Sequence, residues 1–266
     1  MTTISSPDDF AATDPVEVAM TRRRILHAAG ALGAGVLLSG LAVDRAVAAT
    51  TKKAKKKAAG ACVPIVSETG GPFPGDGTNG VNVLTEKGIV RRDIRPSFGS
   101  LTGVAGGVPL TINLTLRRTA SSCAAYPNAA VYIWHCDAIG QYSLYSIETE
   151  NYLRGVQVAD SKGVVSFLTS FPGAYPGRWP HVHFEVYADL ASATSGRNAI
   201  KTSQLALPEA TCKAVYAGPG YDSSAANLVA TPLARDGQFR DGWATQMPSV
   251  SGDTTKGFST NLVVNV

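Results

Sequence analysis

The sequence predicts an all-β fold, a β-sandwich with long loops, over residues 62–266 of a 266-residue chain. Several short runs alternate apolar and polar residues with a period of two, the pattern of a half-buried strand. Turns rich in Gly, Pro and Ser separate these runs, and no long segment with the helical period of 3.6 follows residue 48. Short strands with frequent turns favour two packed sheets.

The candidate strands follow in chain order. Residues 110–117 alternate Leu and Ile with Thr, Asn and Arg, which predicts one buried and one exposed face. A second strand is expected from about 129 to 136. The turn residues 160–163, Asp-Ser-Lys-Gly, separate strand-like runs at 155–159 and 164–170.

The stretch 171–187, FPGAYPGRWPHVHFEVY, starts as a loop broken by Pro and Gly and continues as a strand. His181 and His183 share one face of that strand, about 6.5 Å apart along the chain, and the opposite face is apolar and is expected to enter the core. Tyr175 precedes them on the loop. A phenol has a pKa near ~10, so it ligates only a strong Lewis acid, and a His/Tyr set therefore points to Fe(III).

Zinc is a poorer match for these residues. Zinc sites usually consist of His, Cys or carboxylate ligands, and the sequence contains no Cys-x-x-Cys pair. A three-His site after residue 48 would require His135, which stands at a strand end and is interpreted as structural or pocket-lining.

PGAYPGRWPHVHF resembles the metal-binding signature of the intradiol ring-cleavage dioxygenases, the catechol and protocatechuate 3,4-dioxygenase group. That family holds a non-haem ferric ion with two tyrosines and two histidines, and the resemblance implies Tyr175, His181 and His183 as three of the ligands. VYIWHCDAIGQYS, residues 131–143, places Tyr142 at the fourth. The resemblance covers roughly residues 62–266, most strongly 129–204, and implies the β-sandwich as well.

The resemblance also implies a reaction. A catechol-type aromatic ring would be cleaved by O2 between its two hydroxyl-bearing carbons, giving a cis,cis-muconate-type diacid. Tyr175 would leave the metal when catechol binds, while Tyr142 stays. Arg178 matches a family arginine that stabilises negative charge on the ring, and Gln204 matches a polar residue near the oxygen site.

Other parts of the chain match the family less directly. The segment ETGGPFPGDG, residues 68–77, resembles the family segment over the active-site mouth, although its composition equally suits a surface loop. The spacing from Tyr175 to His181 is short, and Trp179 is expected to intrude and reshape the pocket. The long helical dimerisation region of the catechol 1,2-dioxygenase branch has no counterpart, so a homodimer would need another interface.

Residues 1–48 resemble a twin-arginine signal peptide. Thr21-Arg22-Arg23-Arg24 precedes a short run rich in Gly and Ala, and the A-x-A site Ala46-Val47-Ala48 follows. This predicts secretion of an already folded protein, with an uncleaved anchor as the alternative. Residues 49–61 are expected to form a disordered tether whose five lysines account for the whole positive charge of residues 49–266. The positive net charge is therefore no evidence for a nucleic-acid surface. The lysines of the tether could instead bind anionic cell-surface polymers.

The four cysteines, Cys62, Cys123, Cys136 and Cys212, allow two disulfides in three pairings, with a buried thiol at Cys136 as an alternative. Two other functions remain open. One is an Fe(II) enzyme with His181, His183 and Glu185 as a two-His-one-carboxylate triad. The other is a non-catalytic secreted β-sandwich binding module. A visible spectrum distinguishes the Fe(II) triad from the ferric site, because tyrosinate bound to ferric iron absorbs visible light and the triad does not. Metal analysis of the purified protein distinguishes the binding module from both enzymes.

Overall fold

The computed structural model of the chain describes residues 62–266. The predicted signal peptide, residues 1–48, and the predicted tether, residues 49–61, lie outside the described residues. Within the described part, no helix is both long enough and apolar enough to cross a membrane.

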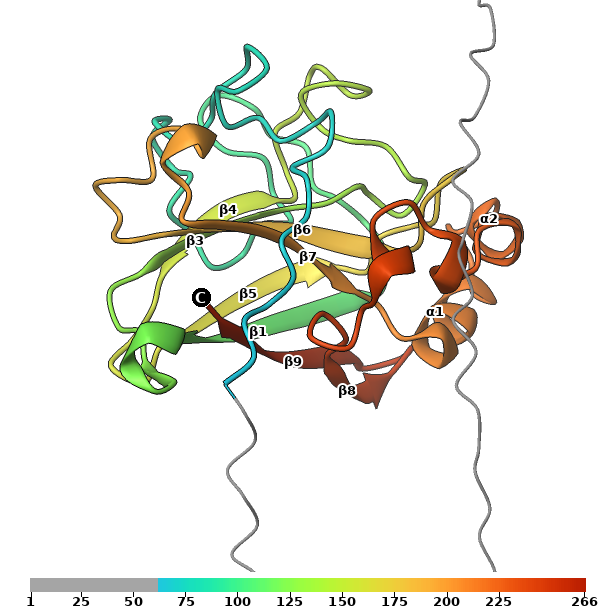
Figure 1. The fold of residues 1–266 in the computed structure, drawn as a ribbon. Coiled ribbons are helices and arrows are strands. Elements are labelled where there is room, and N and C mark those ends of the chain that lie inside the picture. Colours follow the sequence, from blue (N-terminus) through green and yellow to red (C-terminus); the bar gives the residue numbers. More distant parts are fainter. Residues whose placement is uncertain (1–61) are drawn as a thin grey trace, which may run out of the picture. The chain divides into compact units, whose positions relative to one another are not determined.

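Two β-sheets pack face to face (Figure 1). The first has the order β2-β1-β9-β8, with β5 also paired to β1, and the second has the order β4-β3-β6-β7. Their strands are β1 (Pro109–Arg118), β2 (Ala124–Ala125), β3 (Ala130–Trp134), β4 (Arg154–Val158), β5 (Val164–Ser170), β6 (His181–Tyr187), β7 (Lys201–Ala206), β8 (Ser249–Asp253) and β9 (Gly257–Asn265). The β-sandwich that the sequence predicts is therefore confirmed.

The core lies between the sheets and is built from the predicted alternation. In β1 the residues 110, 112, 114 and 116 are buried, and they pack in one cluster with the apolar face of β6, Val182, Phe184 and Val186. β1 pairs with β5 antiparallel and with β9 parallel, which makes it central in its sheet. The opposite face of β6 points away from this core, toward the long loops that cover the second sheet (Figure 1).

Two short helices were not foreseen from the sequence. α1 (Glu209–Tyr216) begins after Pro208 and carries an ion pair between Lys213 and Glu209, one helical turn apart. α2 (Ser224–Ala230) follows it, and both lie beside one end of the sandwich (Figure 1). Helices of two turns show too few repeats of the 3.6-residue period to be recognised in a sequence. Four 3-10 turns complete the elements: Thr119–Ser121, Gly196–Asn198, Leu233–Arg235 and Phe239–Asp241.

The structure selects one disulfide, Cys62–Cys123. It ties the first described residue to the end of the β1–β2 connection, across a separation of 61 residues. Cys136 and Cys212 are buried free thiols. His135 is also buried, with its ring nitrogens bonded to the carbonyl of Cys136 and the hydroxyl of Thr169, each at 2.7 Å, in agreement with its structural interpretation.

Candidate metal centre

A single row of side chains crosses the outer face of the second sheet. Arg154 of β4 lies opposite Trp134 of β3, Trp134 lies opposite His183 of β6, and His183 lies opposite Gln204 of β7. Directly paired residues share a face, so these four side chains all stand toward the covering loops. Each is fully or almost fully buried. The candidate site is thus built on four hydrogen-bonded strands.

The two histidines of β6 lie on this face as predicted. Their Nε2 atoms are 3.0 Å apart, and both rings are buried. The Nδ1 atom of His181 lies 2.5 Å from the carbonyl oxygen of Trp179, which requires a proton on Nδ1 and leaves Nε2 with a free lone pair. Burial, followed by the charge of Arg178, lowers the pKa of His181 to about 3, so its imidazole is neutral as a metal ligand must be.

The tyrosines reach the same point from two loops. Tyr142 follows a turn fixed by Asp137, whose carboxylate accepts the backbone N–H groups of Ile139 and Gln141. Tyr142 is 2 % exposed, whereas Tyr175, on the loop before β6, is partly exposed at the edge of the site. The two hydroxyl oxygens are 3.2 Å apart.

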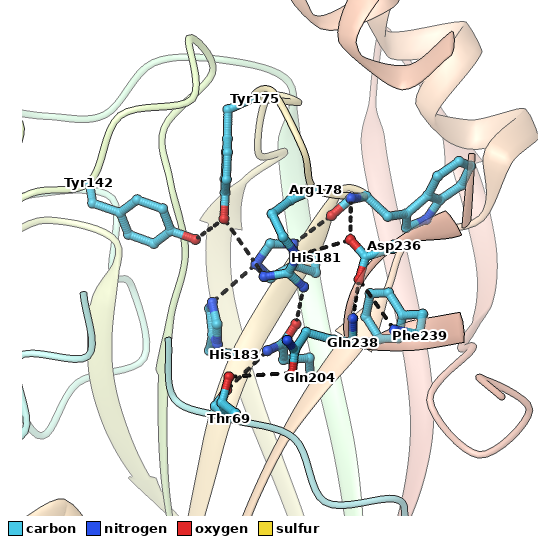
Figure 2. Close-up of polar contacts among 11 residues, drawn as sticks. Thr69, Tyr142, Tyr175, Arg178, His181, His183, Gln204, Asp236, Gln238 and Phe239 are labelled. Atoms are coloured by element: carbon cyan, nitrogen blue, oxygen red, sulfur yellow. Dashed lines mark hydrogen bonds and ion pairs between the residues drawn. The ribbon is translucent and has the colours of Figure 1, made fainter. Parts of the chain in front are cut away.

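Four potential ligand atoms therefore converge (Figure 2). The Oη atoms of Tyr142 and Tyr175 are 3.2 Å apart, Tyr175 Oη is 3.3 Å from His181 Nε2, and the two Nε2 atoms are 3.0 Å apart. Atoms bound about 2.1 Å from one ion lie about 3.0–3.4 Å from their neighbours, so the separations fit a shared ion. Among residues 62–266, no cluster of three His, Cys, Asp or Glu side chains is suited to a metal. The tyrosines are thus integral to this candidate site.

Both phenols hold their protons tightly in the metal-free protein. Burial raises the pKa of Tyr142 well above 10 and raises that of Tyr175 to about 12. A strong Lewis acid is needed to displace such protons, and Fe(III) is the hard, highly charged ion that suits oxygen and imidazole donors together. The donor set therefore fits ferric iron.

A second set of polar groups borders the histidines. The guanidinium of Arg178 places Nη1 3.3 Å from His181 Nε2 and donates from Nη2 to Gln204 Oε1 at 2.6 Å. Gln204 in turn donates to the backbone carbonyl of Thr69. The sequence indicated Arg178 and Gln204 separately, and the structure places them in direct contact beside the histidines (Figure 2).

Three contributors to the site were missed in the sequence. Trp134 stacks on His183 with ring centroids 4.8 Å apart and an interplanar angle of 5°. Arg154 donates to the carbonyls of Pro74 and Ser143, and so ties the segment 68–77 to the turn that carries Tyr142. Asp236 binds Arg178 at 2.9 Å. Trp134 was noted only as part of a motif, and no local pattern marks Arg154 or Asp236 as a partner of residues so far away in the chain.

The expectation for Trp179 is wrong. Its side chain does not intrude into the site but packs in the core between the sheets, 3 % exposed, and its indole N–H donates to the carbonyl of Leu207. The core buries the large apolar ring and still gives its N–H a hydrogen-bond acceptor, which is more favourable than a place beside polar ligand atoms. The segment 68–77 does lie against the site: a Cβ at Gly71 would be 3.4 Å from His183 Cε1, and Phe73 packs on Tyr142.

Glu185 does not join the histidines. Its carboxyl accepts the hydroxyl of Tyr187 at 2.5 Å and borders a cavity of about 420 Å³ that also contains Asp76 and Thr202. Burial raises the pKa of Glu185 to about 8, which keeps the carboxyl neutral at pH 7. Because this carboxyl is bonded to Tyr187 and borders another cavity, the geometry disfavours the His181-His183-Glu185 triad.

No protein-family model matches the chain, and no curated protein matches it in sequence. Solved structures do match it. An intradiol ring-cleavage dioxygenase from Tetranychus urticae is 23 % identical, with 77 % of this chain and 94 % of that one covered and a TM-score of 0.59. A second dioxygenase structure has the same identity and coverage and a TM-score of 0.60. This chain therefore has the fold of these dioxygenases.

Proposed function

We propose that the protein is a non-haem Fe(III) dioxygenase that cleaves a catechol-type ring between its two hydroxyl-bearing carbons. The convergence of two phenol oxygens and two imidazole nitrogens, 3.0–3.3 Å from their neighbours, carries the proposal. The fold shared with an intradiol ring-cleavage dioxygenase supports it. Tyr142, Tyr175, His181 and His183 would hold the iron, whose Lewis acidity and redox chemistry activate the ring toward O2.

The protein's own residues divide the remaining work. The two histidines are held by β6, and the buried Tyr142 follows a turn that Asp137 fixes, so these three fix the position of the site. The Oη of Tyr175 is the group placed to take a catechol proton, because its loop contains Pro176 and Gly177 and its ring is the more exposed of the two. Arg178 Nη1, 3.3 Å from His181 Nε2, is placed to stabilise negative charge on a bound ring.

The product expected from this cleavage is a cis,cis-muconate-type diacid containing both atoms of O2. The test is to purify residues 49–266, the chain expected after cleavage near Ala48, load ferric iron, and add catechol under 18O2 while recording absorbance and product mass. Incorporation of both labelled atoms into a ring-opened diacid is the expected result. Iron-loaded protein that binds catechol without opening the ring would refute the catalytic assignment, and protein that binds no iron would favour the binding module.

We also propose that the chain is exported by the twin-arginine pathway, with cleavage near Ala48. The Cys62–Cys123 disulfide supports this, because structural disulfides persist in oxidising compartments outside the cytoplasm. Replacing Arg22 and Arg23 by Lys should retain the precursor in the cytoplasm. Unchanged export of that variant would refute the pathway.

A further inference from the structure

Asp236 is a buried carboxylate that bonds Arg178 and the backbone N–H of Trp179 but none of the four candidate ligand atoms. It lies between the 3-10 turns Leu233–Arg235 and Phe239–Asp241, and it is fully buried although it is charged. It is 58 residues from Arg178 in the chain, and the C-terminal segment brings it there (Figure 2).

Both oxygens of Asp236 are saturated by donors from the protein. Oδ2 accepts Arg178 Nε at 2.9 Å and the backbone N–H of Trp179 at 2.7 Å. Oδ1 accepts the backbone N–H groups of Gln238 at 2.8 Å and Phe239 at 3.2 Å. Burial alone would raise its pKa, but the bonds from Arg178 and Trp179 outweigh burial and lower it. The carboxylate therefore stays charged and has no free oxygen to offer a substrate.

The bond to Nε determines how the planar guanidinium is turned. A guanidinium presents five N–H groups in a fixed fork, so holding one edge orients the others. With Nε on Asp236 and Nη2 on Gln204, Nη1 is directed at the cluster of ligand atoms, 3.3 Å from His181 Nε2. The side chain of Arg178 is only 20 % exposed, so its charge also needs a local counterion.

We propose that Asp236 is a positioning residue for the reaction: it turns and neutralises Arg178 so that Nη1 faces the bound aromatic ring. The inference rests on the proposed function, since it assigns a task to Arg178 in that function. It adds Asp236, a C-terminal residue that no sequence pattern connects with the histidines, to the functional unit.

The test compares Asp236→Asn with the wild type. Asparagine keeps the shape but removes the charge and replaces one acceptor by a donor. That donor must face either Arg178 Nε and the Trp179 N–H or the N–H groups of Gln238 and Phe239. We expect unchanged iron content, catechol affinity within about threefold when measured anaerobically from the visible spectrum, and kcat lowered roughly 10–100-fold. Asp241→Asn is the matched control, because Asp241 is exposed at the end of the same segment, and it should match the wild type.

A double-mutant cycle shows whether Asp236 acts through Arg178. In an Arg178→Gln background, Asp236→Asn should cause no further loss of kcat. Additive losses, or an Asp236→Asn kcat equal to that of Asp241→Asn, would overturn the inference. If Asp236→Asn does not fold, Arg178→Lys is measured in its place. A single ammonium cannot contact Asp236, Gln204 and the ring together, so kcat should fall to the same extent. An unchanged kcat would overturn the inference.

The same measurements distinguish failure of the proposed function from failure of the role of Asp236. A wild-type protein that binds no iron and opens no ring refutes the function itself. An active wild type whose kcat is unaffected by Asp236→Asn refutes only the role of Asp236.

Discussion

The candidate site consists of two halves that are held in different ways. The strand-borne half, defined as Arg154, Trp134, His181, His183 and Gln204, lies on four adjacent hydrogen-bonded strands. The loop-borne half, defined as Tyr142, Tyr175, Arg178 and Asp236, comes from three separate connections, with Tyr175 and Arg178 on the same one. The strands fix where the imidazoles lie, whereas each loop residue depends on a specific hydrogen bond. Under the proposed function, the strands and the turn before Tyr142 would supply the fixed ligands, and Tyr175 would supply the movable one.

The largest difference is expected between the two tyrosines of the loop-borne half. Tyr142→Phe removes a buried ligand on a fixed turn and should lose most of the iron. Tyr175→Phe should retain iron, because three protein ligands remain, but it loses the group placed to accept a catechol proton. Its rate of catechol binding should fall about 10²–10⁴-fold. Iron analysis and stopped-flow absorbance of both variants measure this, and equal iron loss with identical binding rates would contradict the division of roles.

A second experiment breaks the connection between the halves. Arg154 donates to the carbonyls of Pro74 and Ser143 and to the hydroxyl of Tyr132 from a position that is 0 % exposed. Arg154→Met would leave the Ser143 carbonyl without a donor and would remove the charged donor to Pro74 and Tyr132, which still bond each other. Hydrogen bonds from a charged group are worth about 1.5–3 kcal/mol each, so the free energy of unfolding should fall by about 3–5 kcal/mol.

Urea denaturation monitored by circular dichroism measures the effect of Arg154→Met. Arg117→Met is the control, because Arg117 is exposed on β1, and it should stay within about 0.5 kcal/mol of the wild type. If both variants unfold alike, Arg154 does not connect the halves.

The disulfide offers a perturbation outside both halves. Cys62–Cys123 closes a loop with a sequence separation of 61 and bonds the β1–β2 connection of the first sheet. Cys62→Ser should lower the free energy of unfolding by about 2–4 kcal/mol while leaving iron content unchanged. A reducing agent should bring the wild type to the stability of the variant and should not affect the variant. Iron loss in Cys62→Ser would show that the site depends on the first sheet as well.

Within the strand-borne half, the sequence predicted the two histidines from a local pattern but missed the roles of Arg154 and Trp134. A period of two is a local signal, so the strand at 181–187 and the shared face of its histidines followed from a few consecutive residues. Tyr175 was noted because it precedes the histidines on their loop, whereas Tyr142 was found only through a family resemblance. Asp236 and the stack of Trp134 on His183 depend on contacts between distant segments, for which no local pattern exists. The burial of Trp179 in the core was missed for the same reason: the residues that it packs against come from other parts of the chain.

The iron content and visible spectrum of the wild type and His181→Ala test directly whether the two tyrosines and two histidines bind a ferric ion. His181 Nε2 lies between Tyr175 Oη and His183 Nε2, at 3.3 and 3.0 Å, so its loss opens the ligand cluster at its middle. We expect one ferric ion per wild-type chain, a broad visible absorption from tyrosinate ligation that shifts when catechol is added, and loss of both iron and colour in His181→Ala. Full iron content and unchanged colour in His181→Ala, or a colourless iron-loaded wild type, would contradict this expectation.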